Sequence, residues 1–146
     1  RPIPQSKESP GSSGGLIPGI ESFRSPEGAL AAIFRTLHFQ TDQHEIADPE
    51  DFATLDRVAS YLASHRDVYI FVAGHCDERA SEAYNLALGT RRANAVRRHL
   101  VKRGVSPDQI FTISYGKEHP TALGHDAAAW AENRRAEFKF YERRPS

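Results

Sequence analysis

Two apolar runs separated by one long helical pattern constrain the fold of this chain most. Val68–Val72 is a continuous β-branched and aromatic run, which predicts a central strand buried on both faces and ended by Gly74. Ile110–Tyr115 predicts a later strand. Between them, apolar residues three and four apart predict one face of a long helix: Leu86, Gly89, Ala93, Val96 and Leu100. Gly104 is a suitable stop for that helix, so the region predicts a helical crossover between two strands.

Signals before this region predict a short helix and a first strand. Ser25–Glu27 has the capping serine and following proline of a helix start, and the helix continues towards Phe34. Leu37 and Phe39 alternate with polar neighbours, which predicts a strand that ends near Asp42.

The remaining elements complete the fold class. Asp48–Asp51 combines a cap, a proline and two acids, so it predicts a helix that runs to about His65. A short helix is expected over Ala127–Ala131, and Phe138 and Phe140 alternate with charged residues in a last strand. Strands that alternate with helices predict an α+β fold with a mixed sheet covered by helices.

The first twenty residues differ in composition from the rest. Residues 1–20 are rich in Pro, Gly and Ser, which predicts a flexible tether, and residues 21–146 are expected to form one folded domain. The chain begins with Arg1 rather than Met, and we expect a processed piece from which an export or anchoring segment has been removed.

Charge and cysteine content exclude several function classes. Nineteen Lys and Arg balance nineteen Asp and Glu, so the chain lacks the basic excess of a general nucleic-acid binder. A single cysteine, Cys76, forms no internal disulfide and no multi-cysteine zinc site, and no metal or cofactor is expected. We interpret Cys76 as a structural thiol, because His75 beside it in a strand points to the opposite face and is no base for it.

The densest polar segment, residues 74–81, follows the predicted central strand, where open sheets place ligand sites. The alternative interpretation is a solvated turn before a capped helix. Sequence patterns favour the binding site. They are Gly-His-Cys-Asp-Glu-Arg at 74–79, Tyr-Asn-Leu-Ala-Leu-Gly at 84–89, Arg-Arg-Ala-Asn-Ala-Val at 91–96, Ser-Tyr-Gly-Lys-Glu at 114–118 with Pro120, and Asn-Arg-Arg at 133–135.

These patterns resemble the OmpA-like family, and within it the peptidoglycan-associated lipoprotein branch, over about residues 37–141. The resemblance implies a β/α/β/α/β-β sandwich and a non-catalytic domain that binds the diaminopimelate residue of uncrosslinked peptidoglycan stems. The family roles map best onto Asp77 and Arg92. Lesser candidates for ligand contact are Asn85, Asp42, Asn133 and Arg134.

The chemistry of the residues fits that role. A diaminopimelate end carries an ammonium and a carboxylate on one carbon, and an acceptor-only Asp with a fork-shaped Arg complements it. Asn85 and Arg92 are seven residues apart and therefore lie on one helix face. The alternative is that Asp77 and Arg92 form a structural salt bridge and bind nothing.

Three positions depart from the family pattern. Cys76 replaces a small residue, Gln40 replaces a frequent Asp, and Ala80 replaces the Gly of the turn. Because a left-handed turn position tolerates Ala poorly, we expect a differently shaped loop around Asp77. Trp130 is interpreted as a packing residue of the short helix rather than a sugar platform.

The resemblance also implies partners and a location. Peptidoglycan is the expected ligand, TolB and other Tol proteins are expected partners, and no nucleic acid is expected. The location implied is the periplasmic side of the outer membrane, through a lipid on an N-terminal Cys that this chain lacks. The alternatives are the wall-binding domain of a porin tail or motor stator, or a cell-wall hydrolase.

Overall fold

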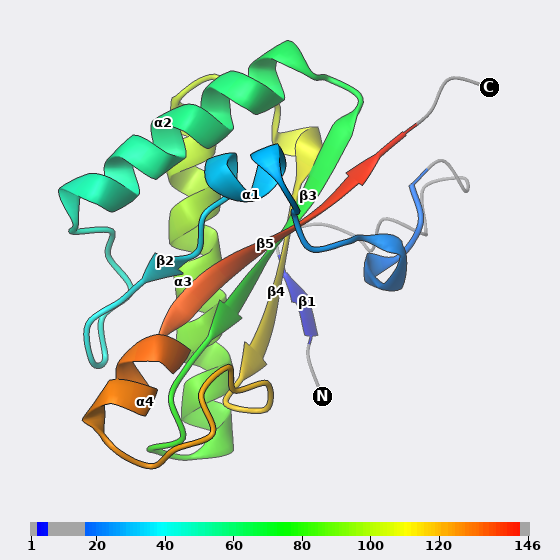
Figure 1. Ribbon diagram of the computed structural model, residues 1–146. Coiled ribbons are helices and arrows are strands. Elements are labelled where there is room, and N and C mark those ends of the chain that lie inside the picture. The colour runs from blue at the N-terminus through cyan, green and yellow to red at the C-terminus, as the bar shows by residue number, and fades with distance from the viewer. Residues whose placement is uncertain (1–2, 6–16, 144–146) are drawn as a thin grey trace.

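A mixed five-stranded sheet forms the centre of the computed structural model, which describes residues 3–5 and 17–143 (Figure 1). The strand order is β1-β4-β3-β5-β2, and only β3 and β4 run parallel. The strands are β1 (Ile3–Gln5), β2 (Leu37–His38), β3 (Val68–His75), β4 (Ile110–Gly116) and β5 (Arg135–Glu142). The α+β fold and the mixed sheet expected from the sequence are confirmed.

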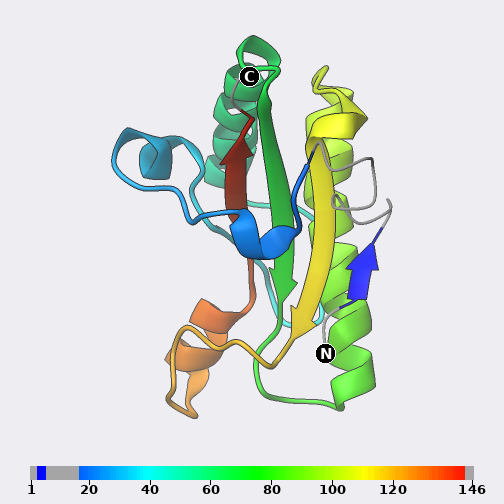
Figure 2. The ribbon, with the colours of Figure 1, turned by 90° about the vertical axis from the view of Figure 1, so that its right-hand side faces the viewer.

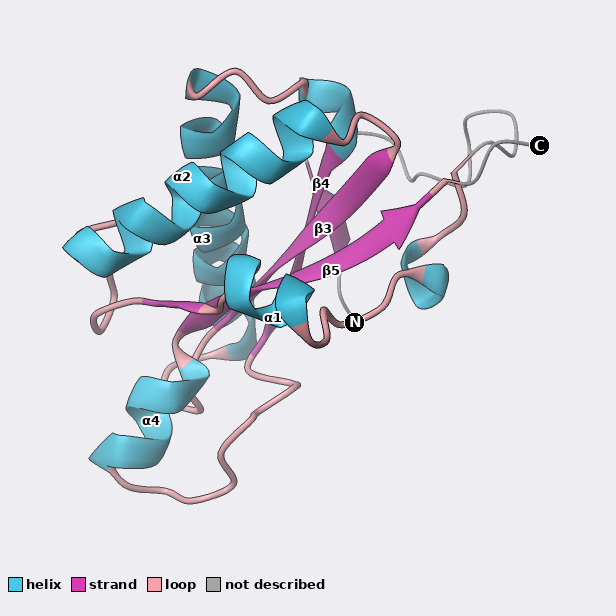
Figure 3. Ribbon diagram, turned by 45° about the horizontal axis from the view of Figure 1, so that its top comes forward, coloured by secondary structure: helices cyan, strands magenta, loops and turns pink. Residues whose placement is uncertain are grey.

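Helices cover one face of this sheet. The helices are α1 (Ala29–Ile33), α2 (Pro49–Ser64), α3 (Glu82–Lys102) and α4 (Ala127–Asn133), with short 3-10 turns at Ile20–Ser22 and Pro107–Gln109. Helices α2 and α3 pack on one side of the sheet, whereas the 17–24 segment crosses the other side (Figure 2). The short α1 lies beside α2 near β5 (Figure 3).

Two cores result from the alternation of side chains along the strands. On the helix-covered face, alternate residues of β3 such as Ile70 and Val72 are buried against the helices. Leu55 of α2 and Leu100 of α3 belong to the same core. The opposite face buries Phe71, Phe111 and Ile113 beneath Ile17 and Phe23. The run from Val68 is therefore buried on both faces, as the sequence predicted.

Helix capping follows the sequence signals. Asp48 caps α2 by accepting a hydrogen bond from the Glu50 N–H at 2.9 Å, and Pro49 is the first residue of the helix. Ser81 caps α3 by accepting one from the Tyr84 N–H at 3.1 Å. The predicted extent of both helices is confirmed, and α3 continues through Gly89 without a break.

A close approach between α3 and β3 depends on two glycines. A Cβ atom added to Gly74 would lie 1.9 Å from the carbonyl oxygen of Gly89, and one added to Gly89 would lie 2.2 Å from Ser114 Oγ. Only glycines allow the backbones of helix and strand to come this near. The contact fixes the end of β3, and therefore the loop that follows it, against the first turns of α3.

Four boundaries differ from expectation. Helix α1 begins at Ala29 and not at Ser25, because Arg24 pairs with Phe140 through two backbone hydrogen bonds of 2.8 Å and keeps the chain extended there. Strand β2 is only two residues long. Strand β3 continues past Gly74 through a shift in register, and α4 extends two residues beyond Ala131.

The described parts of the first twenty residues contact the domain. Ile3–Gln5 forms an edge strand antiparallel to β4, and Ile17 is buried, so at these positions the structure departs from a free tether. Residues 1–2 and 6–16 lie outside those described. The division of the chain at residue 20 remains a prediction. In the described part, none of the helices has the length and apolar character to cross a membrane.

Candidate functional site

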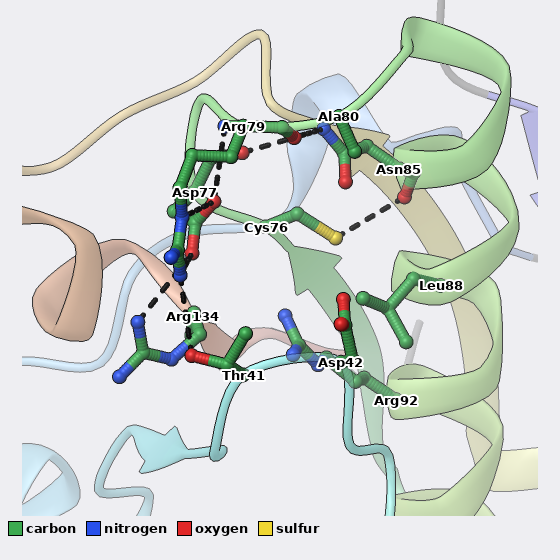
Figure 4. A pocket seen from close by; sticks show the side chains of 10 residues that line it. All are labelled: Thr41, Asp42, Cys76, Asp77, Arg79, Ala80, Asn85, Leu88, Arg92 and Arg134. Carbon is green, nitrogen blue, oxygen red and sulfur yellow. Dashed lines mark hydrogen bonds and ion pairs between the residues drawn. The ribbon is translucent and has the colours of Figure 1, made fainter.

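A pocket of about 190 Å³ lies at the end of the sheet where β3 and β4 terminate (Figure 4). The loop after β2, the loop after β3, α3 and the residue after α4 each contribute side chains. The lining residues are Thr41, Asp42, Cys76, Asp77, Arg79, Ala80, Asn85, Leu88, Arg92 and Arg134. Five of the six residues selected from the sequence are among them, which leaves out only Asn133.

Arg92 is the most deeply buried charged residue of the pocket, with 1% of its surface exposed. Its guanidinium donates to three backbone carbonyls, those of Gln43 at 2.8 Å, His75 at 2.9 Å and Gln40 at 3.1 Å. Burial lowers the pKa of Arg92, although a guanidinium stays charged in proteins. The arginine thus joins the loop after β2 to the end of β3 and has a fixed orientation.

Asp77 is surrounded by other cations. Arg79 donates to it from its backbone N–H at 3.0 Å, from Nε at 3.2 Å and from a terminal nitrogen at 2.7 Å, and Arg134 approaches at 3.4 Å. Burial alone would raise the pKa of Asp77, but the hydrogen bonds and charge of Arg79 and the contact with Arg134 outweigh it and lower that pKa. The carboxylate is therefore ionised at neutral pH.

The ion-pair partners of Asp77, where the structure describes them, are Arg79 and Arg134. Arg92 instead bonds to carbonyls. The direct salt bridge between Asp77 and Arg92, which was the alternative to a binding pair, is therefore not the arrangement in this pocket.

The loop after β3 forms its left-handed turn despite Ala80. Ala80 has a φ of 71°, so the alanine adopts the left-handed conformation that favours glycine. The expected difference in loop shape from other family members stays a prediction. Such a conformation costs a non-glycine residue about 1–2 kcal/mol. The Asn85 amide donates to the Arg79 carbonyl at 2.5 Å, and Lys117 Nζ donates to the Ala80 carbonyl at 2.9 Å, and both contacts hold the turn.

Three sequence-selected residues support the pocket in different ways. Asn85 uses its amide N–H to hold the loop, although it lines the cavity. Asp42, at a φ of 60°, accepts a hydrogen bond from the Tyr84 hydroxyl at 3.2 Å. Arg134 donates through Nε to the Phe39 carbonyl at 2.8 Å and so fixes the other side of the pocket.

The structure does not bring Asn133 into the pocket. Its Oδ1 accepts from the N–H groups of Thr121 at 2.7 Å and Ala122 at 2.9 Å, and its Nδ2 donates to the Ala122 carbonyl at 2.9 Å. These three side-chain hydrogen bonds all hold the loop after β4. Its place in a sequence motif therefore reflects loop structure and not pocket lining.

Five further lining residues were not chosen as ligand contacts from the sequence: Thr41, Cys76, Arg79, Ala80 and Leu88. All but Thr41 stand in or beside the quoted motifs, which were the available signal. Thr41 Oγ1 accepts from Arg79 at 3.2 Å, a contact over 38 residues that no local pattern predicts.

Cys76 lines the pocket as a neutral thiol. Its Sγ donates to the Asn85 carbonyl at 3.2 Å, and burial raises the pKa of the thiol to about 11. The His75 ring lies apart from it, against Tyr115 and within 3.3 Å of Glu137. Across the described ranges, no three His, Cys, Asp or Glu residues are placed to hold a metal ion.

The OmpA family model matches residues 38–134. The chain belongs to the OmpA family. This match spans every residue that lines the pocket.

Individual relatives extend the comparison. The chain is 43% identical to the peptidoglycan-associated lipoprotein of Pseudomonas aeruginosa, over 88% of this chain and 80% of that one. It is 50% identical to the protein of the same name from Rhizobium meliloti, over 84% and 69%. The OmpA-family resemblance and its lipoprotein branch are confirmed.

Solved structures agree with this assignment. The crystal structure of the peptidoglycan-associated lipoprotein from Burkholderia pseudomallei superposes with a TM-score of 0.74 and 45% identity, covering 80% of this chain and 96% of that chain. The C-terminal domain of Helicobacter pylori MotB superposes with a TM-score of 0.66 at 24% identity, over 73% and 84%, and shares the fold.

Proposed function

We propose that this OmpA-family domain binds peptidoglycan without catalysis, by holding the diaminopimelate end of an uncrosslinked stem peptide. The observation that carries the proposal is the pocket in which a buried Arg92 and an ionised Asp77 lie among residues from four separate segments. Relatives that share 43% and 50% identity carry the name peptidoglycan-associated lipoprotein.

The charges of the pocket suit a zwitterion. Two carboxylates, Asp42 and Asp77, face three guanidiniums, those of Arg79, Arg92 and Arg134. An amino acid end presents one ammonium and one carboxylate, each of which finds an opposite charge here. The cavity of about 190 Å³ is small, so it suits the end group of a stem peptide and not a whole disaccharide peptide.

Arg92 retains capacity for a ligand. A guanidinium has five N–H donors, and three of them are used on backbone carbonyls. One N–H on each terminal nitrogen is left for the ligand carboxylate. Asp77 would accept hydrogen bonds from the ligand ammonium in addition to those it already accepts from Arg79.

The biological setting follows the lipoprotein relatives. We propose that the chain serves as the wall-binding part of a lipoprotein that tethers the outer membrane from its periplasmic side, and that TolB and other Tol proteins are its partners. The alternative is the wall-binding domain of a porin tail or motor stator. The identity of 45% to a lipoprotein of known structure, against 24% for MotB, favours the lipoprotein branch.

Sedimentation with purified sacculi tests the proposal. The parent chain should pellet with sacculi whose stems end in free diaminopimelate and should remain in solution with sacculi in which that carboxylate is amidated. Release of soluble muropeptides during the assay would favour the hydrolase alternative. Failure of the folded parent chain to pellet with unmodified sacculi would contradict wall binding.

A further inference from the structure

One side chain of α4 contacts both residues that follow Asp77. The guanidinium carbon of Arg79 lies 4.3 Å from the centre of the Trp130 ring. Trp130 Nε1 donates to Glu78 Oε2 at 2.8 Å, and the other carboxylate oxygen of Glu78 accepts from His125 Nδ1 at 2.7 Å. Trp130 itself does not line the pocket.

Trp130 is not a core residue of its helix. The buried residues of α4 are Ala129 and Asn133, whereas Trp130 is half-buried. Its two polar contacts are with the loop after β3, so its packing is directed at that loop. The expectation that Trp130 serves only to pack the short helix therefore misses its position beside the pocket.

Arg79 connects Trp130 to Asp77. The N–H groups of Arg79 reach the Asp77 carboxylate at 3.2 and 2.7 Å, while the guanidinium carbon lies over the indole ring. The carboxylate and the indole therefore both restrain the same guanidinium, one through hydrogen bonds and the other through a cation–π contact. With 39% of its side chain exposed, Arg79 would gain rotamer freedom if the aromatic face were removed.

On the basis of the proposed function, we propose that Trp130 is a positioning residue for the diaminopimelate site, because it holds Arg79 and thereby fixes the Asp77 carboxylate. The ligand never needs to touch the indole. Trp130 is also the one tryptophan of the sequence, so its fluorescence reports directly on the surroundings of Arg79 and Asp77.

Variants at Trp130 separate positioning from packing. A muropeptide ending in free diaminopimelate is titrated calorimetrically into the parent chain, Trp130→Ala and Trp130→Phe. Trp130→Ala should weaken binding roughly five- to tenfold, and Trp130→Phe should recover most of the affinity because it keeps an aromatic face for Arg79. If Trp130→Ala does not fold, Trp130→Leu replaces it, since leucine keeps apolar volume without an aromatic face.

A matched control and a double mutant complete the test. Tyr61 is a half-buried aromatic residue of α2 that stacks on His65, so Tyr61→Ala should reduce stability without changing affinity. In an Arg79→Ala background, Trp130→Ala should cause no further loss of affinity, because the two residues act through one contact.

Fluorescence gives a second readout. Titration with the muropeptide should change Trp130 emission in the parent chain and leave it unchanged in Asp77→Asn. Parent affinity retained in Trp130→Ala or Trp130→Leu, with parent binding intact, would overturn the positioning role and leave the proposed function standing. Absence of binding by the parent chain itself would overturn both.

Discussion

At each end of β3, one buried polar side chain donates hydrogen bonds to three backbone carbonyls, but only one of the two ends lies at the pocket. At the start of the strand, Gln109 Nε2 lies within 3.1 Å of the carbonyls of Leu62 and His65 and within 2.9 Å of that of Val68. At its end, Arg92 donates to three carbonyls in the same manner. Both side chains are almost completely buried, at 3% and 1% exposure.

The two ends differ in the number of N–H donors that remain for a ligand. An amide has two N–H donors, and Gln109 directs both at its three carbonyls, so no N–H donor is left for a ligand carboxylate. Arg92 closes the same kind of junction and keeps two donors and a full charge next to a cavity. A buried side chain that holds two segments together can also bind a ligand when it has more N–H donors than its hydrogen bonds within the protein use.

Removing either of these side chains should produce the largest effects on stability. Arg92→Ala and Gln109→Ala each remove one buried side chain that donates to three carbonyls, although some of these carbonyls keep a backbone donor. We expect a loss of about 2–4 kcal/mol in the free energy of unfolding for either variant. Urea unfolding followed by circular dichroism measures this loss. Under conditions where both variants are folded, only Arg92→Ala should lose muropeptide binding, and equal binding by the two would remove the distinction between the ends.

Acid should lower the stability of the fold by protonating Glu137, which contacts His75 at the pocket end of β3. Burial alone would raise the pKa of Glu137, but contacts with His75 and Arg135 outweigh it and lower that pKa to about 2. A carboxyl group whose pKa is lowered in the folded state stabilises the fold at any pH above its pKa in the unfolded chain. This contribution is lost as the pH falls from about 4.5 towards 2. We expect a loss of about 2–3 kcal/mol over this range.

His75 acts in the same direction at higher pH. Burial lowers its pKa below 6.5, against the opposing effect of Glu137, so the folded state disfavours the protonated ring. The contribution of His75 to the free energy of unfolding is therefore complete above pH 6.5 and declines as the pH falls below that value. Unfolding measured from pH 7 to pH 3 should show Glu137→Gln with a smaller decline below pH 4.5 than the parent chain, and parallel curves would contradict the assignment.

Ala80 offers a smaller change in the opposite direction. Its φ of 71° is strained for alanine, and Ala80→Gly relieves that strain while it adds freedom to the unfolded chain. The net result should be a gain of about 0.5–1 kcal/mol with muropeptide affinity within twofold of the parent. Thermal unfolding and titration measure the two quantities, and a clear loss of stability would show that the turn is not strained.

Cys76→Ala should have the smallest effect. The thiol is neutral and its Sγ donates one weak hydrogen bond to the Asn85 carbonyl, so we expect alanine to keep the loop geometry. We expect unchanged wall binding and a loss of about 1 kcal/mol or less. A large loss of binding by the folded variant would give the thiol a direct role.

Signals local in sequence predicted most of the fold and most of the pocket. The cap at Asp48 and the apolar pattern along α3 are such signals, and the motifs brought Asp77 and Arg92 to one cavity. Distant pairings were inaccessible to this reasoning. The start of α1 depends on the pairing of Arg24 with Phe140, more than a hundred residues away.

The roles of individual site residues were harder to predict than their identities. Asn133 stands in a motif but spends its amide on the loop after β4, which only its three contacts reveal. Similarly, Ile3 pairs with Ser114 although the composition of that segment predicts a free tether. A motif shows that a residue matters to the domain and leaves open whether it holds the ligand or the loop.

The central claim is that Asp77 and Arg92 together hold a zwitterionic end group. The most direct measurement is calorimetric titration of a diaminopimelate muropeptide into the parent chain, Asp77→Asn and Arg92→Lys, with folding confirmed by circular dichroism. Each charge-assisted contact contributes about 1.5–3 kcal/mol, so each variant should bind tenfold or more weakly, and amidation of the ligand carboxylate should mimic Arg92→Lys. Equal affinities in all three folded proteins would show that the pair is structural.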